Sequence, residues 1–290
     1  MNRLGGSAVV LLAVSAGAPA LSAGADIAKG FVSVGGNRLY YEVEGEGCPV
    51  VLIAGGGGMD LRQWDGEFAA LASRHRTVRF DPRGVGRSDT PNTPYSDVAD
   101  LRAVLDGLSI ERAVLVGVSS GGGIALDFAI VHPERVSGLV LSAPLVHGFE
   151  MSEDQKKRVA GFAQASQKSV AEGVRAFLDD PYFLPAPGNP EARRVAEKLM
   201  TENARDIPPG LSRELEPPTV SRLGEVRAPT LLLVGELDHP DLHRRVEFLS
   251  GAISGSTKRV MPGAGHMLNL EKPREFAEET LGFVRRRVCR

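Results

Sequence analysis

Short apolar runs and longer stretches of helical periodicity alternate along the chain from residue 31 to its end. Two of the runs, Pro49–Ala54 and Ala113–Val118, are apolar throughout, which is typical of strands buried on both faces of a parallel sheet. Two alternating runs, at 31–34 and 39–43, flank a Gly-Gly-Asn turn and predict a hairpin. The strands predicted after the hairpin are 49–54, 77–80, 113–118, 136–142, 230–234 and 257–261.

Helices are expected between the strands, because apolar residues recur there every three or four positions. Leu61, Trp64, Phe68 and Leu71 show this spacing and predict one helix over 59–73. Strands that alternate with helices predict an α/β fold, with a mostly parallel twisted sheet and helices on both faces. The other core helices are expected at 96–108, directly after 113–118, at 241–249 and at 273–288.

The alternation stops between residues 145 and 224. Strand signals are absent there, and helical stretches are separated by loops that contain proline. We therefore predict a helical cap insertion over 145–224, between core segments 26–144 and 225–290. The helices of this insertion are expected at about 152–170, 170–179 and 190–203.

Residues 1–25 differ in composition from the rest of the chain. A short basic start, Met1-Asn2-Arg3, precedes an uncharged stretch rich in small apolar residues, and Ala18-Pro19-Ala20 fits a small-x-small cleavage site. This pattern predicts a signal peptide and export to the periplasm or the cell exterior, with a cytoplasmic location as the alternative. Proline and many small residues make the stretch a poor bilayer span, so no stable membrane insertion is expected.

The two cysteines bear on the question of export. Cys48 opens a predicted strand and Cys289 closes the last predicted helix. These ends lie at the same edge of a parallel sheet with covering helices, so a disulfide is geometrically possible if the chain is exported. Two unrelated thiols remain the favoured interpretation.

Composition and charge are those of an ordinary globular protein, with 42% hydrophobic and 24% charged residues and a net charge of −2. The charge gives no reason to expect binding to nucleic acid. No spacing of cysteine and histidine typical of a metal site occurs in the sequence. The oligomeric state does not follow from these numbers.

A serine lies at the junction between a buried strand and the helix that follows it. The strand 113–118 runs into Gly117-x-Ser119-x-Gly121. Glycine is needed on either side of Ser119, because the two backbone arms of a sharp strand-to-helix turn nearly touch there. The turn lifts the hydroxyl clear of the sheet, and the first amides of the helix favour negative charge at the same place. The pattern predicts a nucleophile elbow with Ser119 as the nucleophile.

A serine hydroxyl is a weak nucleophile that needs a base, and the base needs a group that orients it. His266 follows a predicted strand in a loop with Gly263 and Gly265, and Asp238 follows the preceding strand. The carboxyl ends of parallel strands lie along one edge of the sheet, so Ser119, Asp238 and His266 are expected to converge. We predict a catalytic triad of these three residues, a chemistry that requires no metal or organic cofactor.

The tetrahedral intermediate of acyl transfer needs hydrogen-bond donors for its oxyanion. The backbone amide of Ser120, directly after the nucleophile, is one candidate donor. The second is expected from the run of four glycines after the strand 49–54. We choose Gly56 for this role, with Gly57 as the alternative.

These motifs resemble those of the α/β-hydrolase fold family, from about Phe31 to the C-terminus. The resemblance implies a serine esterase, a lactonase or a carbon–carbon bond hydrolase, and a mainly structural role for the loop 81–88. Relatives usually carry His-Gly where this chain has Ala54-Gly55, and dehalogenase and epoxide-hydrolase relatives carry Asp in place of Ser119. The matching segments are Gly55-Gly56, Asp81-x-Arg83-Gly84-x-Gly86-x-Ser88, Gly117-x-Ser119-x-Gly121-Gly122, Gly235-x-x-Asp238 and Gly263-x-Gly265-His266.

The expected function is hydrolysis of a small-molecule carboxylic ester or lactone through an acyl-enzyme. The same triad also suits hydrolysis of a carbon–carbon bond, perhydrolysis or acyl transfer, and the same fold also suits a small-molecule receptor. Of the other polar residues, His239 and His243 are expected on the surface of the helix after Asp238. His147 and Glu150 open the insertion and are candidates to face the pocket.

Overall fold

The computed structural model describes residues 27–184, 189–205 and 210–289, so the predicted leader over 1–25 lies outside the described residues. The described strands form one sheet in the order β1-β2-β4-β3-β5-β6-β7-β8. The two pairings of β2 are antiparallel and all others are parallel, which agrees with the predicted hairpin and with a mostly parallel sheet. The strands are β1 (Ala28–Val34), β2 (Asn37–Glu44), β3 (Pro49–Ile53), β4 (Arg76–Phe80), β5 (Ala113–Val118), β6 (Val136–Ser142), β7 (Thr230–Gly235) and β8 (Thr257–Met261).

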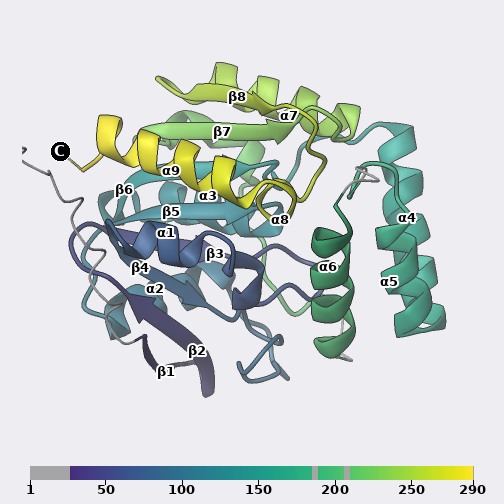
Figure 1. Ribbon diagram of the computed structural model, residues 1–290, viewed down its shortest axis with the longest axis horizontal. Coiled ribbons are helices and arrows are strands. Elements are labelled where there is room, and N and C mark those ends of the chain that lie inside the picture. Colours follow the sequence, from purple (N-terminus) through teal and green to yellow (C-terminus); the bar gives the residue numbers. More distant parts are fainter. Residues whose placement is uncertain (1–26, 185–188, 206–209, 290) are drawn as a thin grey trace, which may run out of the picture.

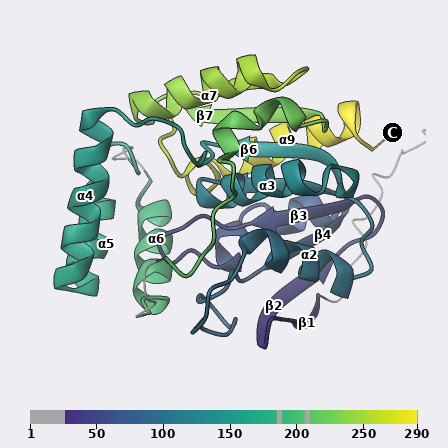
Figure 2. The same cartoon turned by 180° about the vertical axis from the view of Figure 1, so that it is seen from behind.

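Helices cover both faces of the sheet, which confirms the predicted fold class (Figures 1 and 2). Side chains of α2, α3 and α7 form a core on one face, and those of α1, α8 and α9 form a core on the other. The α-helices are α1 (Phe68–Ala72), α2 (Asp97–Gly107), α3 (Ser120–Val131), α4 (Glu153–Lys168), α5 (Val170–Leu178), α6 (Pro190–Glu202), α7 (Pro240–Ala252), α8 (Leu268–Glu271) and α9 (Pro273–Arg287). Short 3₁₀ helices are η1 (Leu61–Trp64), η2 (Pro133–Arg135), η3 (Thr219–Ser221) and η4 (Leu223–Glu225).

The central strands contribute to both cores. On β3, Val51 and Ile53 face the core formed with α2 and α3, whereas Val50 and Leu52 face the core formed with α1 and α9. All four side chains are fully buried. This explains the continuous apolar run, because alternate residues of a strand point to opposite faces and here both faces are covered.

The prediction of one helix over 59–73 is wrong. The segment forms η1 and the short helix α1, and the two are separated by residues 65–67. The carboxylate of Asp60 accepts the amide of Arg62 and caps η1 at its start. At the break, Gly66 lies so close to Pro273 that an added Cβ would be 2.6 Å from the proline ring. Apolar periodicity identified the buried face correctly but carried no information about this contact with α9.

Three helices of the insertion, residues 145–224, stand beyond the carboxyl ends of the parallel strands. Figure 1 shows α6 next to the ends of the strands, with α4 and α5 on its far side, and Figure 2 shows the same order from behind. The insertion contains the helices predicted from its sequence. None of the helices in the described ranges has both the length and the apolarity to span a bilayer.

The preference for two unrelated thiols is wrong, because Cys48 and Cys289 form a disulfide. Their Cα atoms lie 6.3 Å apart, within the usual range for a bonded pair. Cys48 directly precedes β3, and Cys289 follows α9 by two residues. The bond therefore joins the start of a central strand to the end of the last helix, at the edge of the sheet opposite the insertion.

Candidate active site

The segment around Ser119 adopts the sharp turn that its glycines predict. Ser119 has a φ of 54° and a ψ of −118°, a strained conformation for a residue with a side chain. A Cβ on Gly117 would lie 2.3 Å from the carbonyl oxygen of Gly121, and one on Gly121 would lie 2.3 Å from that of Ile53. The backbone of Ser119 is fixed by a 2.9 Å hydrogen bond from its amide to the carbonyl of Ser142. The turn therefore requires both glycines and leaves the serine side chain partly exposed at the end of β5.

His266 and Asp238 lie together at the carboxyl ends of β7 and β8. The Nδ1 atom of His266 is 3.0 Å from Oδ2 of Asp238. The Asp238 side chain is 1% exposed and that of His266 is 17% exposed, so the carboxylate is buried behind a ring that solvent can still reach. The second carboxylate oxygen of Asp238 accepts the amide of His239 at 2.7 Å. The contact between Nδ1 of His266 and Asp238 fixes the tautomer of the imidazole ring and leaves its Nε2 atom to act as a base.

The loop after β8 folds back over the end of β7, which brings the histidine toward the middle of the sheet. A Cβ on Gly235 would lie 2.1 Å from the carbonyl oxygen of Gly265, so the two segments cross with backbone against backbone. The amide of Leu237 donates to the carbonyl of Ala264 at 2.8 Å and holds the crossing in place. Within the described residues, no hydrogen bond joins the hydroxyl of Ser119 to the imidazole of His266.

The run Gly55–Gly58, called here the glycine loop, lies beside the start of α3. A Cβ on Gly56 would lie 3.2 Å from the Oγ atom of Ser120. The amide of Gly55 is already used, because it donates to Oε1 of Gln63 at 2.8 Å. The described residues offer no acceptor to the amides of Gly56 and Gly57, and Ser120 is the first residue of α3, so its amide has no acceptor within the helix. Among the described residues, the amides of Gly56, Gly57 and Ser120 are therefore left as available hydrogen-bond donors.

Two buried amides connect the glycine loop to the segment after His266. Gln63, which holds Gly55, donates through Nε2 to Oδ1 of Asn269 at 3.2 Å. Asn269 in turn donates to the backbone carbonyl of Gln63 at 2.9 Å. Sequence reasoning missed this pair, because Gln63 and Asn269 are more than 200 residues apart and neither belongs to a motif.

The expectation that His239 lies on the surface is wrong. Its side chain is 3% exposed, and Nδ1 accepts the amide of Asp241 at 3.1 Å, so the ring caps the start of α7. Its Nε2 atom lies 2.8 Å from Oδ2 of Asp154 on α4. The sequence around His239 does not distinguish a histidine that caps α7 from one that is exposed on its surface.

The loop between β4 and α2 has the structural role that the family resemblance implies. Asp81 accepts the amide of Leu61 at 3.0 Å and that of Arg87 at 2.7 Å. Burial raises the pKa of Asp81 to about 6, although both amides favour its ionised form. The carboxylate therefore joins η1 to Arg87, directly after the glycine-rich turn 84–86.

A cavity of about 350 Å³ opens beside the glycine loop and the first turns of α3. Ser120, Gly123, Ile124 and Asp127 line it from α3, at the spacing of one helix face. His147 lines it from the insertion, as its position at the start of that segment suggested, and its Nδ1 atom lies 3.2 Å from Oδ2 of Asp127. The hydrogen bond to Asp127 raises the pKa of His147, against the opposing effect of burial.

The comparison with protein families supports the fold that the sequence motifs predict. Residues 49–273 match the family model described as alpha/beta hydrolase fold. The chain belongs to the α/β-hydrolase fold family. The curated relatives described next are hydrolytic enzymes, so we describe the chain as a hydrolase.

Relatives differ in the substrates that their names give. The chain is 28% identical over 275 residues to 2-hydroxy-6-oxo-6-(2'-aminophenyl)hexa-2,4-dienoic acid hydrolase of Metapseudomonas resinovorans, covering 89% of this chain and 91% of the relative. It is 25% identical over 253 residues to 3-oxoadipate enol-lactonase 1 of Acinetobacter baylyi, with coverages of 86% and 94%. A solved structure of Est816, an N-acyl homoserine lactone degrading enzyme, matches with a TM-score of 0.71 at 29% identity, over 88% of this chain and all of that one.

Proposed function

We propose that the chain is a serine hydrolase of small-molecule carboxylic esters or lactones, with Ser119, His266 and Asp238 as its triad. The observation that carries this proposal is the pairing of His266 with the buried carboxylate of Asp238, on the sheet edge where the strained turn presents Ser119. The strained turn holds Ser119 at this edge, and the buried acid contacts the ring of His266. They are the arrangement that an activated serine requires.

In the proposed mechanism, the Oγ atom of Ser119 attacks the substrate carbonyl while Nε2 of His266 takes its proton. His266 then gives this proton to the departing alkoxide, and an acyl-enzyme on Ser119 remains. Water attacks the acyl-enzyme with His266 again as the base, and the acid product leaves. Asp238 holds the ring in the productive tautomer and stabilises the imidazolium. The hydrogen bond between Ser119 and His266 is expected to close when substrate binds.

The amides of Ser120 and Gly56 are the proposed oxyanion donors, with Gly57 as the alternative to Gly56. Supporting this, Gly55 is excluded by its bond to Gln63, and Gly56 directly adjoins Ser120. The donors come from a helix start and a loop without side chains, so a carbonyl oxygen can approach both closely.

We also propose that the insertion 145–224 covers the site and shapes its specificity. Its backbone contacts the histidine loop, because the amide of His266 donates to the carbonyl of Tyr182 at 2.9 Å. Phe183 places its ring 6.2 Å from that of His266, between centroids. On the other side of the site, Met200 of α6 packs on Gly57. The insertion thus contacts both sides of the proposed reaction centre.

We favour lactones and esters as the substrates, because two of the relatives that match this chain over most of its length are named for lactones. The relative named for a dienoic acid supports the second candidate, hydrolysis of a carbon–carbon bond by the same triad. An assay with a diketone-like acid separates carbon–carbon bond hydrolysis from ester hydrolysis. An assay with an added acceptor alcohol separates acyl transfer from ester hydrolysis. Perhydrolysis is separated by assay with hydrogen peroxide.

The first test is reaction with a fluorophosphonate probe, followed by intact mass and peptide mapping. We expect one adduct at Ser119 that is absent in Ser119→Ala and strongly reduced in His266→Ala. Panels of esters and lactones then identify the substrate. Folded protein that stays unlabelled, and that binds small molecules without converting them, would favour a receptor over an enzyme.

We propose further that the chain is exported. The composition of residues 1–25 supports this, and so does the bond between Cys48 and Cys289, since disulfides persist in oxidising compartments. Expression in a bacterial host followed by fractionation tests the proposal. We expect a shortened chain in the periplasm or medium, and an unshortened chain with free thiols in the cytoplasm would contradict it.

A further inference from the structure

The glycine loop has no side chains, so other segments must hold it in place. Glycine loses more conformational freedom on ordering than other residues do, and a run of four is costly to fix. One end of the loop is held from the core, where Gly55 donates to Gln63. The other end is held from the insertion, because the carbonyl of Gly58 accepts Nδ2 of Asn203 at 2.8 Å.

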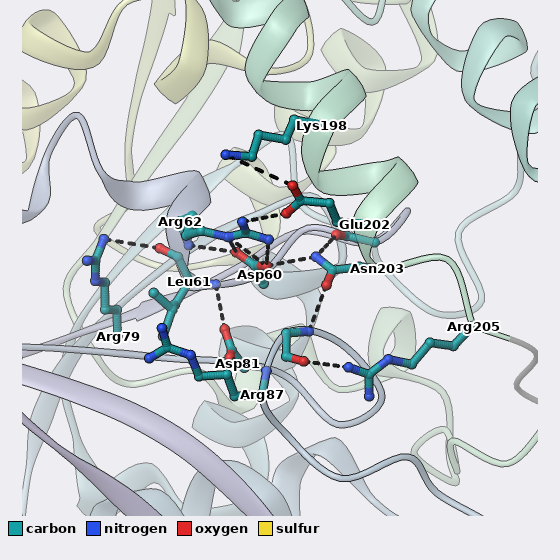
Figure 3. Close-up of polar contacts among 12 residues, drawn as sticks. Asp60, Leu61, Arg62, Arg79, Asp81, Arg87, Lys198, Glu202, Asn203 and Arg205 are labelled. Atoms are coloured by element: carbon teal, nitrogen blue, oxygen red, sulfur yellow. Dashed lines mark hydrogen bonds and ion pairs between the residues drawn. The ribbon is translucent and has the colours of Figure 1, made fainter.

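Asn203 directly follows helix α6 as its C-cap residue and is 6% exposed. Besides its bond to Gly58, its Nδ2 atom donates to Oδ2 of Asp60 at 2.8 Å, and its Oδ1 atom accepts the amide of Gly86 at 3.0 Å. Figure 3 shows the side chain of Asn203 directed toward Asp60. One amide therefore joins the insertion to the glycine loop, to the start of η1 and to the loop after β4.

The backbone of the glycine loop also packs on the last turn of α6. Gly58 has a φ of 86°, and a Cβ there would lie 3.2 Å from the Cα atom of Met200. Gly57 has a φ of 72°, and a Cβ there would lie 3.7 Å from Cε of the same methionine. Both glycines adopt the left-handed region that favours this residue type. The half of the loop that includes the alternative oxyanion donor thus rests directly on the insertion.

Asp60 gives this connection a rigid partner. Its carboxylate receives a forked pair of hydrogen bonds from Arg62, of 3.0 and 2.6 Å, in addition to the bond from Asn203. Burial opposes ionisation of Asp60, but these hydrogen bonds outweigh it and hold its pKa below the usual value. The carboxylate is 2% exposed, so water does not readily replace a lost hydrogen-bond partner, and such a loss costs free energy.

We infer that Asn203 is a positioning residue, through which docking of α6 sets the oxyanion donors of the glycine loop; this inference rests on the function proposed above. Oxyanion donors act mainly on the transition state, so a loosened loop lowers kcat more than it raises KM. The neighbouring Glu202 provides a matched control. It is the last residue of α6 and binds Arg62 at 2.6 Å, but this ion pair is exposed and does not contact the glycine loop.

The test compares Asn203→Ala with Glu202→Ala, with p-nitrophenyl butyrate as substrate and with hydrogen exchange over residues 55–60. In Asn203→Ala we expect kcat to fall about tenfold to a hundredfold, less than the full loss of a donor, and KM to stay within about threefold. The Ki of a trifluoromethyl ketone, which forms a tetrahedral oxyanion, is expected to rise by the factor by which kcat/KM falls. Exchange over 55–60 is expected to accelerate. Glu202→Ala is expected to leave kcat, Ki and exchange within about twofold of the parent.

Hydrogen exchange separates failure of this inference from failure of the proposed function. If the parent protein hydrolyses no ester, faster exchange over 55–60 in Asn203→Ala still supports the connection. Unchanged exchange or unchanged kcat in folded Asn203→Ala would overturn the inference. If Asn203→Ala does not fold, hydrogen exchange of the parent protein tests the inference. Residues 55–60 and the end of α6 are then expected to open with the same free energy, and clearly different protection of the two would contradict the inference.

Discussion

A Cβ atom on Gly117 would lie 2.3 Å from the carbonyl oxygen of Gly121, so no larger residue fits on either arm of the turn that holds Ser119. The obstacles are backbone atoms on both sides, since Gly121 itself faces the carbonyls of Ile53 and Ala54. Backbone of a central strand cannot move aside as the end of a long side chain can. The spacing of these glycines is therefore a steric requirement of the turn.

Gly121→Ala is expected to destabilise the fold by about 3 kcal/mol or more and to abolish reaction with the fluorophosphonate probe, because the added methyl group overlaps two carbonyl oxygens. Urea unfolding and probe labelling check both effects. Gly161→Ala is the matched control. Gly161 lies exposed inside α4 with no atom within 4 Å of an added Cβ, so alanine there is expected to stabilise by up to about 1 kcal/mol and leave labelling unchanged.

Asp238→Asn is expected to lower kcat about 10⁴-fold with little change in KM, because an amide holds His266 in the wrong tautomer and cannot stabilise the imidazolium. Steady-state kinetics on an ester measures the effect. Asp154→Asn changes another carboxylate that contacts a histidine, at 2.8 Å from His239, but its side chain is 72% exposed and lies on α4. The control is expected to keep kcat within about twofold. Equal losses in both variants would contradict the assignment of Asp238.

Much of the fold could be predicted from the sequence because its signals are local. Buried parallel strands need continuous apolar runs, and these runs gave the strand positions. The turn at Ser119 needs two glycines at fixed spacing, and the order of the polar strand ends gave Asp238 and His266. The pairing of Asp238 with His266 agrees with the structure at 3.0 Å.

The contacts that hold the site together are not local, and the sequence did not predict them. The Gln63–Asn269 pair and the bonds of Asn203 join residues more than 100 positions apart. Their partners are largely backbone carbonyls and amides, which leave no trace in residue type. The disulfide was left as the less favoured alternative for a related reason, since the sequence placed Cys48 and Cys289 at one edge but not at bonding distance.

Cys48→Ser is expected to lower the free energy of unfolding by about 2–5 kcal/mol in oxidising buffer, because the lost bond closes a loop across 241 positions of the chain. Urea unfolding with and without reductant measures the effect. The double variant Cys48→Ser/Cys289→Ser is the control. It is expected to match the single variant in both buffers, and all three proteins are expected to converge when the parent is reduced. A parent insensitive to reductant would contradict a stabilising disulfide.

Glu271 is expected to make stability fall as pH rises. Burial raises its pKa to about 7, with the charge of Asp238 adding to the effect, while the amide of Gly265 donates to its Oε1 atom at 2.9 Å and partly opposes it. Its Oε2 atom is buried without a partner in the described structure. The folded chain therefore keeps this proton at pH values where the unfolded chain has released it.

The sign follows from linkage: between about pH 4.5 and 7 the folded state binds more protons than the unfolded state, so the free energy of unfolding decreases with rising pH. Glu271→Gln keeps an acceptor for Gly265 but cannot ionise, so its stability relative to the parent is expected to improve by on the order of 1 kcal/mol from pH 5 to pH 8. Urea unfolding at four pH values measures this difference. Glu278→Gln, at an exposed position of α9, serves as the control. The difference between its free energy of unfolding and that of the parent is expected to stay constant with pH. A difference between Glu271→Gln and the parent that stays constant with pH would show that the carboxyl does not titrate in this range.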